Sequence, residues 1–333
     1  MKKRDLVQSA INHQGGNAVP YYIDLCNETI DKYKEAFVKD FFDKDVAEDY
    51  KAGGLSLYDA VNLAIGNHMI CCETPWWDWD YEKTDPGYFD PFETPEVLPI
   101  IKPDDREDLR EYYKHIHKRY GVYMFAGIYG SHWEKAYFLR GIEPFLADIA
   151  GEPEFAKRLL DFIIDTNVEM LPKVLAYPYF DAVLFGSDWG SQKDLIMSPD
   201  SWRNLIKAGE ARQYKPAKDA GKKVFVHSCG DIVKIMDDIV ELGVDVINPI
   251  QPECMNLRML KERYGDKLSF WGGISTQRTL PYGTPAEVSK EVETTIKLMS
   301  QNGGYITSPS QGILPDVPYE NIKVLIQTAK GFC

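Results

Sequence analysis

The chain has 333 residues, of which 44% are hydrophobic and 27% are charged, a globular composition with ample material for a core. Its formal net charge of −13 argues against binding to nucleic-acid backbones and against attraction to anionic lipid. No apolar run is long enough for a membrane span, and the first residues lack the apolar stretch of a signal peptide. We therefore expect a cytoplasmic protein with neither a nucleic-acid nor a membrane partner.

The cysteine and aromatic contents narrow the class of protein further. Six cysteines in a chain of this length do not indicate a disulfide framework, so we expect reduced thiols or metal ligands. The aromatic share of 13%, with 7 Trp and 20 Tyr, favours a flat organic substrate or a large partner surface.

Short apolar runs alternate with longer amphipathic stretches along the chain. After an N-terminal helix or arm at 1–18, the run Val-Pro-Tyr-Tyr-Ile-Asp-Leu at 19–25 is predicted to be the first strand. Six later runs are apolar on both faces, as expected of buried parallel strands, and they are 122–129, 182–186, 223–229, 244–250, 268–272 and 305–308.

Helical stretches with recognisable ends lie between these runs. One helix is expected over 154–171, with Pro172 ending or kinking it. Thr284 and Glu287 form a capping-box pattern, and Asp316 and Pro318 open the last helix. Such repeated alternation predicts a parallel sheet closed into a (β/α)8 TIM barrel, a single domain over 1–333. No glycine-rich phosphate-binding motif follows any strand, which disfavours a nucleotide-binding sheet.

One segment, 71–99, interrupts this alternation. It combines many aromatic residues, among them Trp76 and Trp77, with prolines and aspartates. A stretch so rich in turn formers predicts a structured insertion loop. Its aromatic side chains are expected either to pack on the barrel or to bind a ligand.

Polar residues at the carboxyl ends of barrel strands face the active site. The predicted strands are followed by an unusual concentration of such residues, namely Asp24, Glu28, His132, Ser187, Asp188, His227, Cys229, Gln251, Glu253, Trp271, Ser308, Ser310 and Gln311. Packing alone does not account for His, Cys and Glu on consecutive strand ends, so we expect an enzyme rather than a binding protein.

The pair His227 and Cys229 is the sharpest local feature. Side chains two residues apart on a strand point the same way. Imidazole nitrogen and thiolate sulfur are preferred ligands of Zn²⁺, and a catalytic site needs one more protein ligand and an open position. Glu253, at the end of the next predicted strand, is the expected third ligand. A buried cysteine beside a hydrogen-bonded histidine is the alternative.

Four segments together resemble the uroporphyrinogen decarboxylase superfamily. They are His-Ser-Cys-Gly-Asp at 227–231, Asn-Pro-Ile-Gln-Pro-Glu at 248–253, Phe-Trp-Gly-Gly-Ile at 270–274 and Pro-Asp-Val-Pro-Tyr-Glu-Asn at 315–321. The resemblance covers residues 150–330 and implies a (β/α)8 barrel with a funnel at the strand carboxyl ends. The superfamily includes a cofactor-free porphyrinogen decarboxylase and zinc methyltransferases that exchange methyl groups with corrinoid or thiol acceptors.

Charge separates these two branches. A porphyrinogen decarboxylase acts on a polycarboxylate and needs an arginine-lined pocket, and the family carries arginines near its N-terminus. The corresponding segment of this chain, 17–24, has no arginine and ends in Asp24, which would repel such a substrate. The methyltransferase branch uses a His-x-Cys pair, matched by His227 and Cys229, and a later cysteine. Here Ser310 or Gln311 stands at that later position. Fewer thiolates leave a more Lewis-acidic zinc, suited to an oxygen atom such as that of an ether.

A second resemblance points to the same substrate class. The methyltransferase components of the phenyl methyl ether O-demethylases of the vanillate and veratrol types carry the pattern Glu-x14-Glu-x20-His. Glu96, Glu111 and His132 reproduce this spacing and form an alternative metal set. Glu111, however, falls in the middle of a helix predicted over 104–120, on a face typical of solvated residues.

The resemblance therefore predicts a corrinoid-dependent methyltransferase that uses Zn²⁺ and demethylates a small aromatic methyl ether. The acceptor is the Co(I) cobalamin of a separate corrinoid protein, for which the 71–99 loop is expected to form part of the docking surface. Asp24 and Asp188 are expected to orient the ring hydroxyl or His227. The residues expected to bind the substrate are Trp76, Trp77, Trp189, Trp271 and Gln311.

Two alternatives stay open. In the first, a zinc methyltransferase with the same scaffold uses methanol, a methylamine or a methylated thiol of the coenzyme M type as its substrate. In another class, a metal-free decarboxylase, lyase or hydrolase uses Asp24 and Asp188 as acid and base. The oligomeric state, a homodimer included, is open as well.

Overall fold

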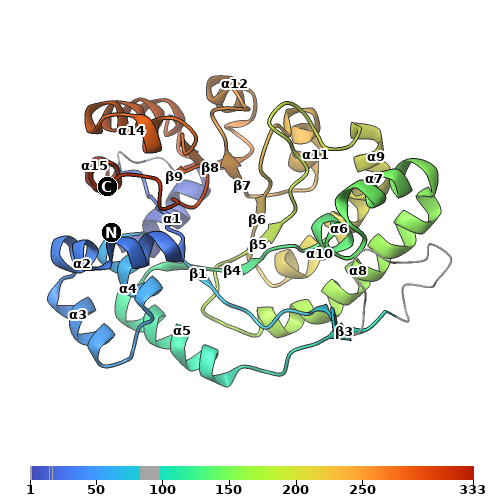
Figure 1. Cartoon of the computed structure of the whole chain (residues 1–333), viewed down its shortest axis with the longest axis horizontal. Coiled ribbons are helices and arrows are strands. Elements are labelled where there is room, and N and C mark those ends of the chain that lie inside the picture. Colours follow the sequence, from blue (N-terminus) through green and yellow to red (C-terminus); the bar gives the residue numbers. More distant parts are fainter. Residues whose placement is uncertain (1, 15, 17, 83–97) are drawn as a thin grey trace. The chain divides into compact units, whose positions relative to one another are not determined.

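The computed structural model of the chain describes residues 2–14, 16, 18–82 and 98–333 (Figure 1). The chain divides into two compact units. The first unit comprises the described parts of Met1–Cys71, Glu111–Met124 and Asp245–Cys333, and the second comprises those of Cys72–Arg110 and Phe125–Val244. The prediction of one domain stays a prediction.

Three parallel strands form the centre of the second unit: β4 (Tyr123–Ile128), β5 (Ala182–Gly186) and β6 (Lys223–His227). In the register of β5 and β6, Gly186 lies opposite His227, so that the two strands end side by side. Every residue of β5 is buried, as the apolar run at 182–186 predicts for a strand covered on both faces. The three strands predicted in this part of the chain are confirmed.

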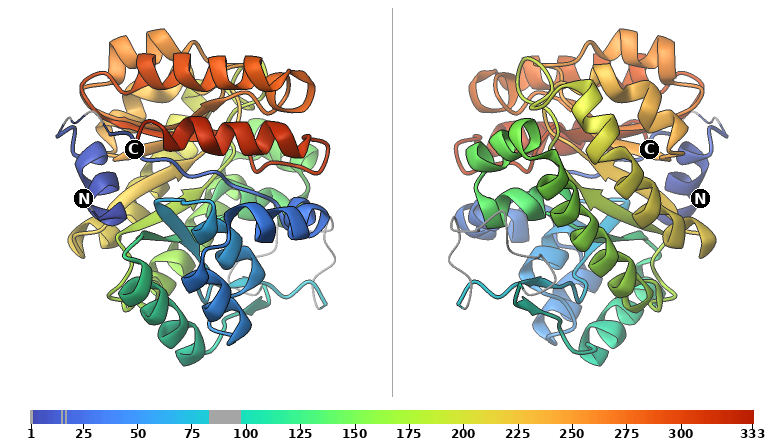
Figure 2. Two further views of the ribbon diagram at one scale, coloured as in Figure 1. Left: turned by 90° about the vertical axis from the view of Figure 1, so that its left-hand side faces the viewer. Right: turned by 90° about the vertical axis from the view of Figure 1, so that its right-hand side faces the viewer.

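Helices connect and cover these strands. They are α6 (Trp133–Arg140), α7 (Ile142–Gly151), α8 (Pro153–Leu175), α9 (Pro199–Leu205), α10 (Lys207–Asp219), the short 3-10 helix η2 (Val233–Ile235) and α11 (Met236–Glu241). The long helix α8 packs along α10 (Figure 2). The expectation that Pro172 ends or kinks α8 is wrong on the end point, because the helix runs on to Leu175 with Pro172 inside it. Buried Val174 holds that last turn against the unit.

The first unit contains three neighbouring parallel strands, β7 (Val246–Ile250), β8 (Ser269–Ile274) and β9 (Tyr305–Pro309), and the strand β1 (Met69–Cys72). Its helices are α1 (Lys3–Ile11), α2 (Asn27–Phe41), α3 (Lys44–Lys51), α4 (Leu57–Ala64), most of α5 (Glu107–Tyr120), α12 (Leu257–Tyr264), α13 (Thr279–Tyr282), α14 (Pro285–Met299) and α15 (Tyr319–Lys330). Helices α14 and α15 lie side by side, in orange-red and red (Figure 2). The capping box of Thr284 and Glu287 is confirmed at the start of α14.

The first strand predicted, 19–25, is not a regular strand. The segment is extended, but it meets β9 and the chain after it only at two isolated bridges, Tyr21 with Thr307 and Leu25 with Ile313. Two causes are visible. Pro20 has no backbone N–H to donate, and the backbone of Ile23 is bonded to a side chain, that of Asn67, through both its N–H and its carbonyl.

The insertion predicted at 71–99 is in part regular structure. Its first two residues, Cys71 and Cys72, belong to β1, a strand that the aromatic and proline content obscured. Farther on, β2 (Asp78–Trp79) pairs antiparallel with β3 (Ile100–Ile101). Residues 83–97, which include Glu96, lie outside the described residues. Among the helices that the structure describes, none is long and apolar enough to cross a membrane.

Candidate metal centre

Three potential metal ligands gather where β5 and β6 end. His227 is the last residue of β6, Cys229 follows two residues later, and Asp188 lies two residues beyond β5. Because Gly186 pairs with His227 in the parallel register, both chains leave the sheet at the same edge. The alternation of side chains then brings His227 and Cys229 to one side, as predicted.

The distances between the three side chains match those of ligands around one ion. Cys229 Sγ lies 3.5 Å from His227 Nε2, and Asp188 Oδ1 lies 3.6 Å from the same nitrogen. One ligand atom from each residue lies within 4.8 Å of the others. Tetrahedral zinc, with bonds of about 2.0–2.3 Å, places neighbouring ligand atoms about 3.3–3.8 Å apart. The nitrogen, sulfur and oxygen donors present therefore fit a zinc ion.

Backbone contacts hold the two loops together at this point. The amide N–H of Cys229 donates to Asp188 Oδ1 at 2.8 Å. Two glycines permit the close approach: a Cβ at Gly190 would lie 2.5 Å from the carbonyl oxygen of Cys229, and Gly230 has a φ of +80° and faces Gly190. The glycines that follow β5 and β6 therefore allow the loops after these two strands to pack against each other.

Helix α6 places a second carboxyl group close by. Burial, together with the carboxylate of Asp188, raises the pKa of Glu134 to about 7. The hydroxyl of Tyr137 donates to Glu134 Oε1 at 3.3 Å, and burial raises the pKa of Tyr137 as well. Both side chains come from the first turns of α6, so the α6 side of the centre carries hydrogen-bonding groups.

An aromatic side chain stands over the histidine. The ring of Tyr129, just after β4, meets that of His227 edge to face with centroids 5.7 Å apart. Tyr129 is 56% exposed, although an aromatic ring gains from burial. It therefore offers an exposed aromatic surface beside the three ligands.

The predicted tryptophans of the second unit lie mostly in its core. Trp77 is fully buried and donates its indole N–H to Asn167 Oδ1 at 2.7 Å. Trp189 is buried against Trp202, with ring centroids 5.2 Å apart. The indole nitrogens of Trp76 and Trp189 have no hydrogen-bond partner among the residues that the structure describes. Trp76, which is half-buried, is the more accessible of the two.

The two described members of the alternative metal set, His132 and Glu111, are engaged in other contacts. His132 is fully buried, and its Nδ1 lies 2.9 Å from Glu210 Oε1. Its Nε2, which has no hydrogen-bond partner in the described part of the chain, faces Gly209. Glu111 is exposed on α5 and pairs with Lys114 at 2.6 Å, while Glu96 lies outside the described residues.

The remaining predicted residues belong to the first unit. Glu253 follows β7 by three residues; its side chain is buried, and its Oε1 accepts a hydrogen bond from the hydroxyl of Ser275. Asp24 Oδ1 accepts the hydroxyl of Tyr58 at 3.0 Å. Trp271, on β8, is buried against Tyr22 with ring centroids 5.4 Å apart. Gln311 follows β9.

Sequence reasoning missed two neighbours of the centre and gave Asp188 a supporting role. Tyr129 closes a predicted strand and Glu134 follows it by five residues, so their position after a strand end was the available signal. The strand-end rule includes Asp188, but only the pairing of β5 with β6 brings it to the His-Cys pair.

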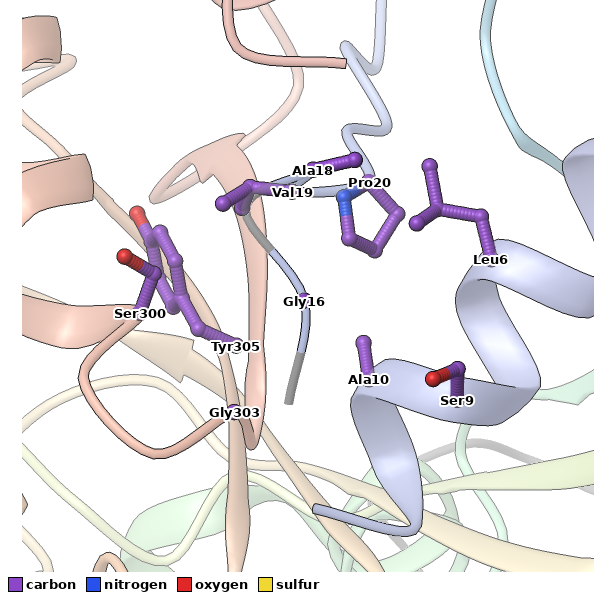
Figure 3. Close-up of a pocket in the computed structure, with 10 residues that line it drawn as sticks. All are labelled: Leu6, Ser9, Ala10, Gly16, Ala18, Val19, Pro20, Ser300, Gly303 and Tyr305. Carbon is purple, nitrogen blue, oxygen red and sulfur yellow. The ribbon is translucent and has the colours of Figure 1, made fainter. Parts of the chain in front are cut away.

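The first unit holds a different kind of hollow, shown in Figure 3. This cavity of about 310 Å³ lies between α1 and the start of β9 and is lined by apolar groups such as those of Leu6, Val19 and Pro20. It contains hydroxyl groups but no titratable acid or base at neutral pH. It lies at the amino end of β9, whereas barrels place their chemistry at the carboxyl ends.

Comparison with known families identifies the chain. The family model described as uroporphyrinogen decarboxylase (URO-D) matches residues 81–332, more than half of the chain. The chain belongs to this family. The superfamily suggested by the segments at 227–231, 248–253, 270–274 and 315–321 is thereby confirmed.

Curated relatives from the URO-D family and from the methyltransferases match parts of the chain. The methylcobamide:CoM methyltransferase MtaA of Methanosarcina barkeri is 27% identical over 131 residues, 39% of this chain and 36% of the relative. A uroporphyrinogen decarboxylase of Pseudoalteromonas translucida is 25% identical over 223 residues, 64% of this chain and 60% of the relative. The chain thus matches between about a third and three fifths of their length.

A solved structure resembles the chain over its whole length. A methyltransferase from Methanosarcina mazei superposes with a TM-score of 0.71 and 18% identity, covering 100% of this chain and 99% of that one. At this identity the likeness shows the fold. It confirms the predicted TIM-barrel-like class of the URO-D family.

Proposed function

We propose that the protein is a zinc-dependent methyltransferase that passes a methyl group to the Co(I) cobalamin of a separate corrinoid protein. The observation that carries the proposal is the meeting of Asp188, His227 and Cys229 at the carboxyl ends of β5 and β6. The match to a methylcobamide:CoM methyltransferase supports methyl transfer that involves a corrinoid.

The ligands favour transfer from oxygen. Zinc held by one imidazole, one thiolate and one carboxylate supplies Lewis acidity that stabilises negative charge on a leaving oxygen. A single thiolate makes this site harder than the sulfur-rich sites that suit thiol substrates. Asp188 replaces Glu253 as the third ligand in this proposal, because Asp188 Oδ1 lies 3.6 Å from His227 Nε2.

An aromatic methyl ether is the donor that we propose. The exposed ring of Tyr129 beside His227 offers a flat donor an aromatic neighbour at the place where its ether oxygen meets the metal ligands. During transfer the bond between the methyl carbon and the ether oxygen breaks, the carbon bonds to cobalt, and the electron pair stays on the phenolate. Trp76, Trp189, Trp271 and Gln311 remain proposed contacts of the ring, and Asp24 a proposed partner of its hydroxyl group.

The test is a methyl-transfer assay with purified protein. The protein is loaded with zinc and incubated with reduced corrinoid protein and a panel of methoxyarenes, and the absorbance change of cobalt on methylation is recorded. We expect methylation with at least one methoxyarene and a loss of at least 100-fold in rate for His227→Ala, since the metal stabilises several kcal/mol of charge.

Other donors in the same assay decide the substrate class. Methylation of cobalt by methanol or a methylated thiol, with no methoxyarene accepted, would contradict the ether assignment while retaining the methyltransferase. An active protein that carries no zinc would contradict the metal mechanism and favour the metal-free acid–base chemistry of Asp24 and Asp188.

A further inference from the structure

A short segment after β4 contacts the end of β5 from one side. The amide N–H and the hydroxyl of Ser131 both donate to the carbonyl of Gly186, at 3.0 and 2.8 Å. Two residues later, the indole N–H of Trp133 donates to the carbonyl of Asp188 at 2.9 Å. Both contacts lie in the second unit, next to the candidate metal centre.

Trp133 is itself firmly placed. Its side chain is fully buried and packs against the rings of Phe145 and Tyr137, with centroids 5.4 and 5.2 Å away. A large buried ring in close packing has little freedom to turn. Its N–H therefore points at a fixed place, the carbonyl oxygen of Asp188.

Asp188 is held at both ends. Trp133 binds its backbone carbonyl, and the amide N–H of Cys229 binds its carboxylate Oδ1 at 2.8 Å. These two directional bonds come from different strand ends and set the direction of the side chain between them. With both in place, Asp188 Oδ1 lies 3.6 Å from His227 Nε2, at the separation that ligands of one zinc ion require.

We infer that Trp133 is a positioning residue of the metal centre, which orients Asp188 for coordination through the indole–carbonyl hydrogen bond. The inference rests on the proposed function and adds a residue that its zinc site does not include. Groups that orient metal ligands in this way typically contribute 10- to 100-fold to metal affinity. Loss of the indole donor should therefore weaken zinc binding through Asp188.

Trp79 provides a matched control. Like Trp133, it is buried and donates its indole N–H to a backbone carbonyl, that of Lys135, at 2.8 Å. Lys135 belongs to α6, the helix that Trp133 begins, so Trp79→Phe tests for a general loosening of this helix. The carbonyl that it releases is not that of a metal ligand.

Zinc affinity is measured on the full chain by competition with a chromophoric chelator. We expect Trp133→Phe to bind zinc at least tenfold more weakly than the wild type and Trp79→Phe to stay within threefold of it. Cobalt(II) substituted for zinc should show a shifted d–d absorption band in Trp133→Phe alone, which a purely structural role would not produce.

A double-mutant cycle tests the route of the effect. In an Asp188→Ala background, Trp133→Phe should change zinc affinity by less than twofold, because the residue it orients no longer binds the ion. Circular dichroism of the zinc-free proteins checks that each variant is folded. If Trp133→Phe does not fold, Trp133→Met removes the same donor with a flexible apolar side chain.

Three results would overturn the inference: wild-type affinity in the Trp133 variant, an equal loss in Trp79→Phe, or an undiminished effect in the Asp188→Ala background. A wild-type protein that binds neither zinc nor cobalt would instead refute the proposed metal site itself. The two failures are thus distinguishable.

Discussion

At the scale of single residues, either Asp188 or Glu253 can be proposed as the third metal ligand beside His227 and Cys229. Asp188 Oδ1 accepts a hydrogen bond from the amide of Cys229 and lies 3.6 Å from His227 Nε2. Glu253 Oε1 accepts a hydrogen bond from the hydroxyl of Ser275 and lies 3.9 Å from Arg278 Nε. The other oxygen of Glu253, Oε2, has no hydrogen-bond partner among the residues that the structure describes. The distance of 3.6 Å between Asp188 Oδ1 and His227 Nε2 is what favours Asp188.

Zinc content of purified variants checks this assignment. We expect Asp188→Asn and Cys229→Ser to retain less than half of the zinc per chain, since each weakens or removes a charged donor, and Glu253→Gln to retain all of it. Metal analysis by emission spectrometry measures the outcome. Zinc lost with Glu253→Gln but kept by Asp188→Asn would return the third position to Glu253.

The buried residue His68 makes the free energy of unfolding depend on pH. Burial lowers the pKa of His68 to about 4, against about 6.5 in an unfolded chain. Between pH 6.5 and pH 4, His68 therefore binds a proton in the unfolded state but stays mostly neutral in the folded state. The stability that neutral His68 provides is complete above pH 6.5 and is lost as the pH falls towards 4.

Urea unfolding at pH 7 and pH 4 measures this effect. We expect the wild type to lose about 3 kcal/mol more of its free energy of unfolding than His68→Gln over this range. The variant serves as the control for all the other groups that titrate. Parallel losses in the two proteins would show that the pKa of His68 is the same in the folded and unfolded states.

At the scale of elements, one side chain takes the place of a strand partner. Asn67 is fully buried, accepts the N–H of Ile23 at 2.8 Å and donates to its carbonyl at 3.0 Å. A further bond of 2.7 Å from its amide to Asn62 fixes the orientation of that amide. The extended segment 19–25, which contains Asp24, thus depends on the side chain of an asparagine for hydrogen bonds that a neighbouring strand would supply from its backbone.

Substitution of Asn67 tests this dependence. Asn67→Ala leaves a buried N–H and a buried carbonyl without partners, so we expect a loss of about 2–4 kcal/mol in the free energy of unfolding. Asn204→Ala, at an exposed position of α9, should change it by less than about 0.5 kcal/mol. Denaturant unfolding of both variants gives the comparison. Similar values for the two would mean that water or a shifted backbone satisfies Ile23.

At the scale of the whole molecule, period and composition predicted the strand–helix alternation of the URO-D fold. The run 182–186 matches β5 residue for residue, because a strand buried on both faces is apolar throughout. Strand β1 was missed, since four residues beside a tryptophan- and proline-rich stretch carry no clear period. The segment 19–25 was assigned as a regular strand because its pattern does not show that Asn67, more than forty residues away, binds its backbone.

The sequence by itself determined the pair His227 and Cys229, because two residues that are two apart on an extended chain share a face by local geometry alone. Only the tertiary structure brought Asp188, Tyr129 and Trp133 to that pair. Their positions depend on the register between separate strands and on the packing of α6, and such contacts between distant segments leave no period in the chain. Short stretches of sequence thus identify the types of ligand, whereas their arrangement around one point depends on the tertiary structure.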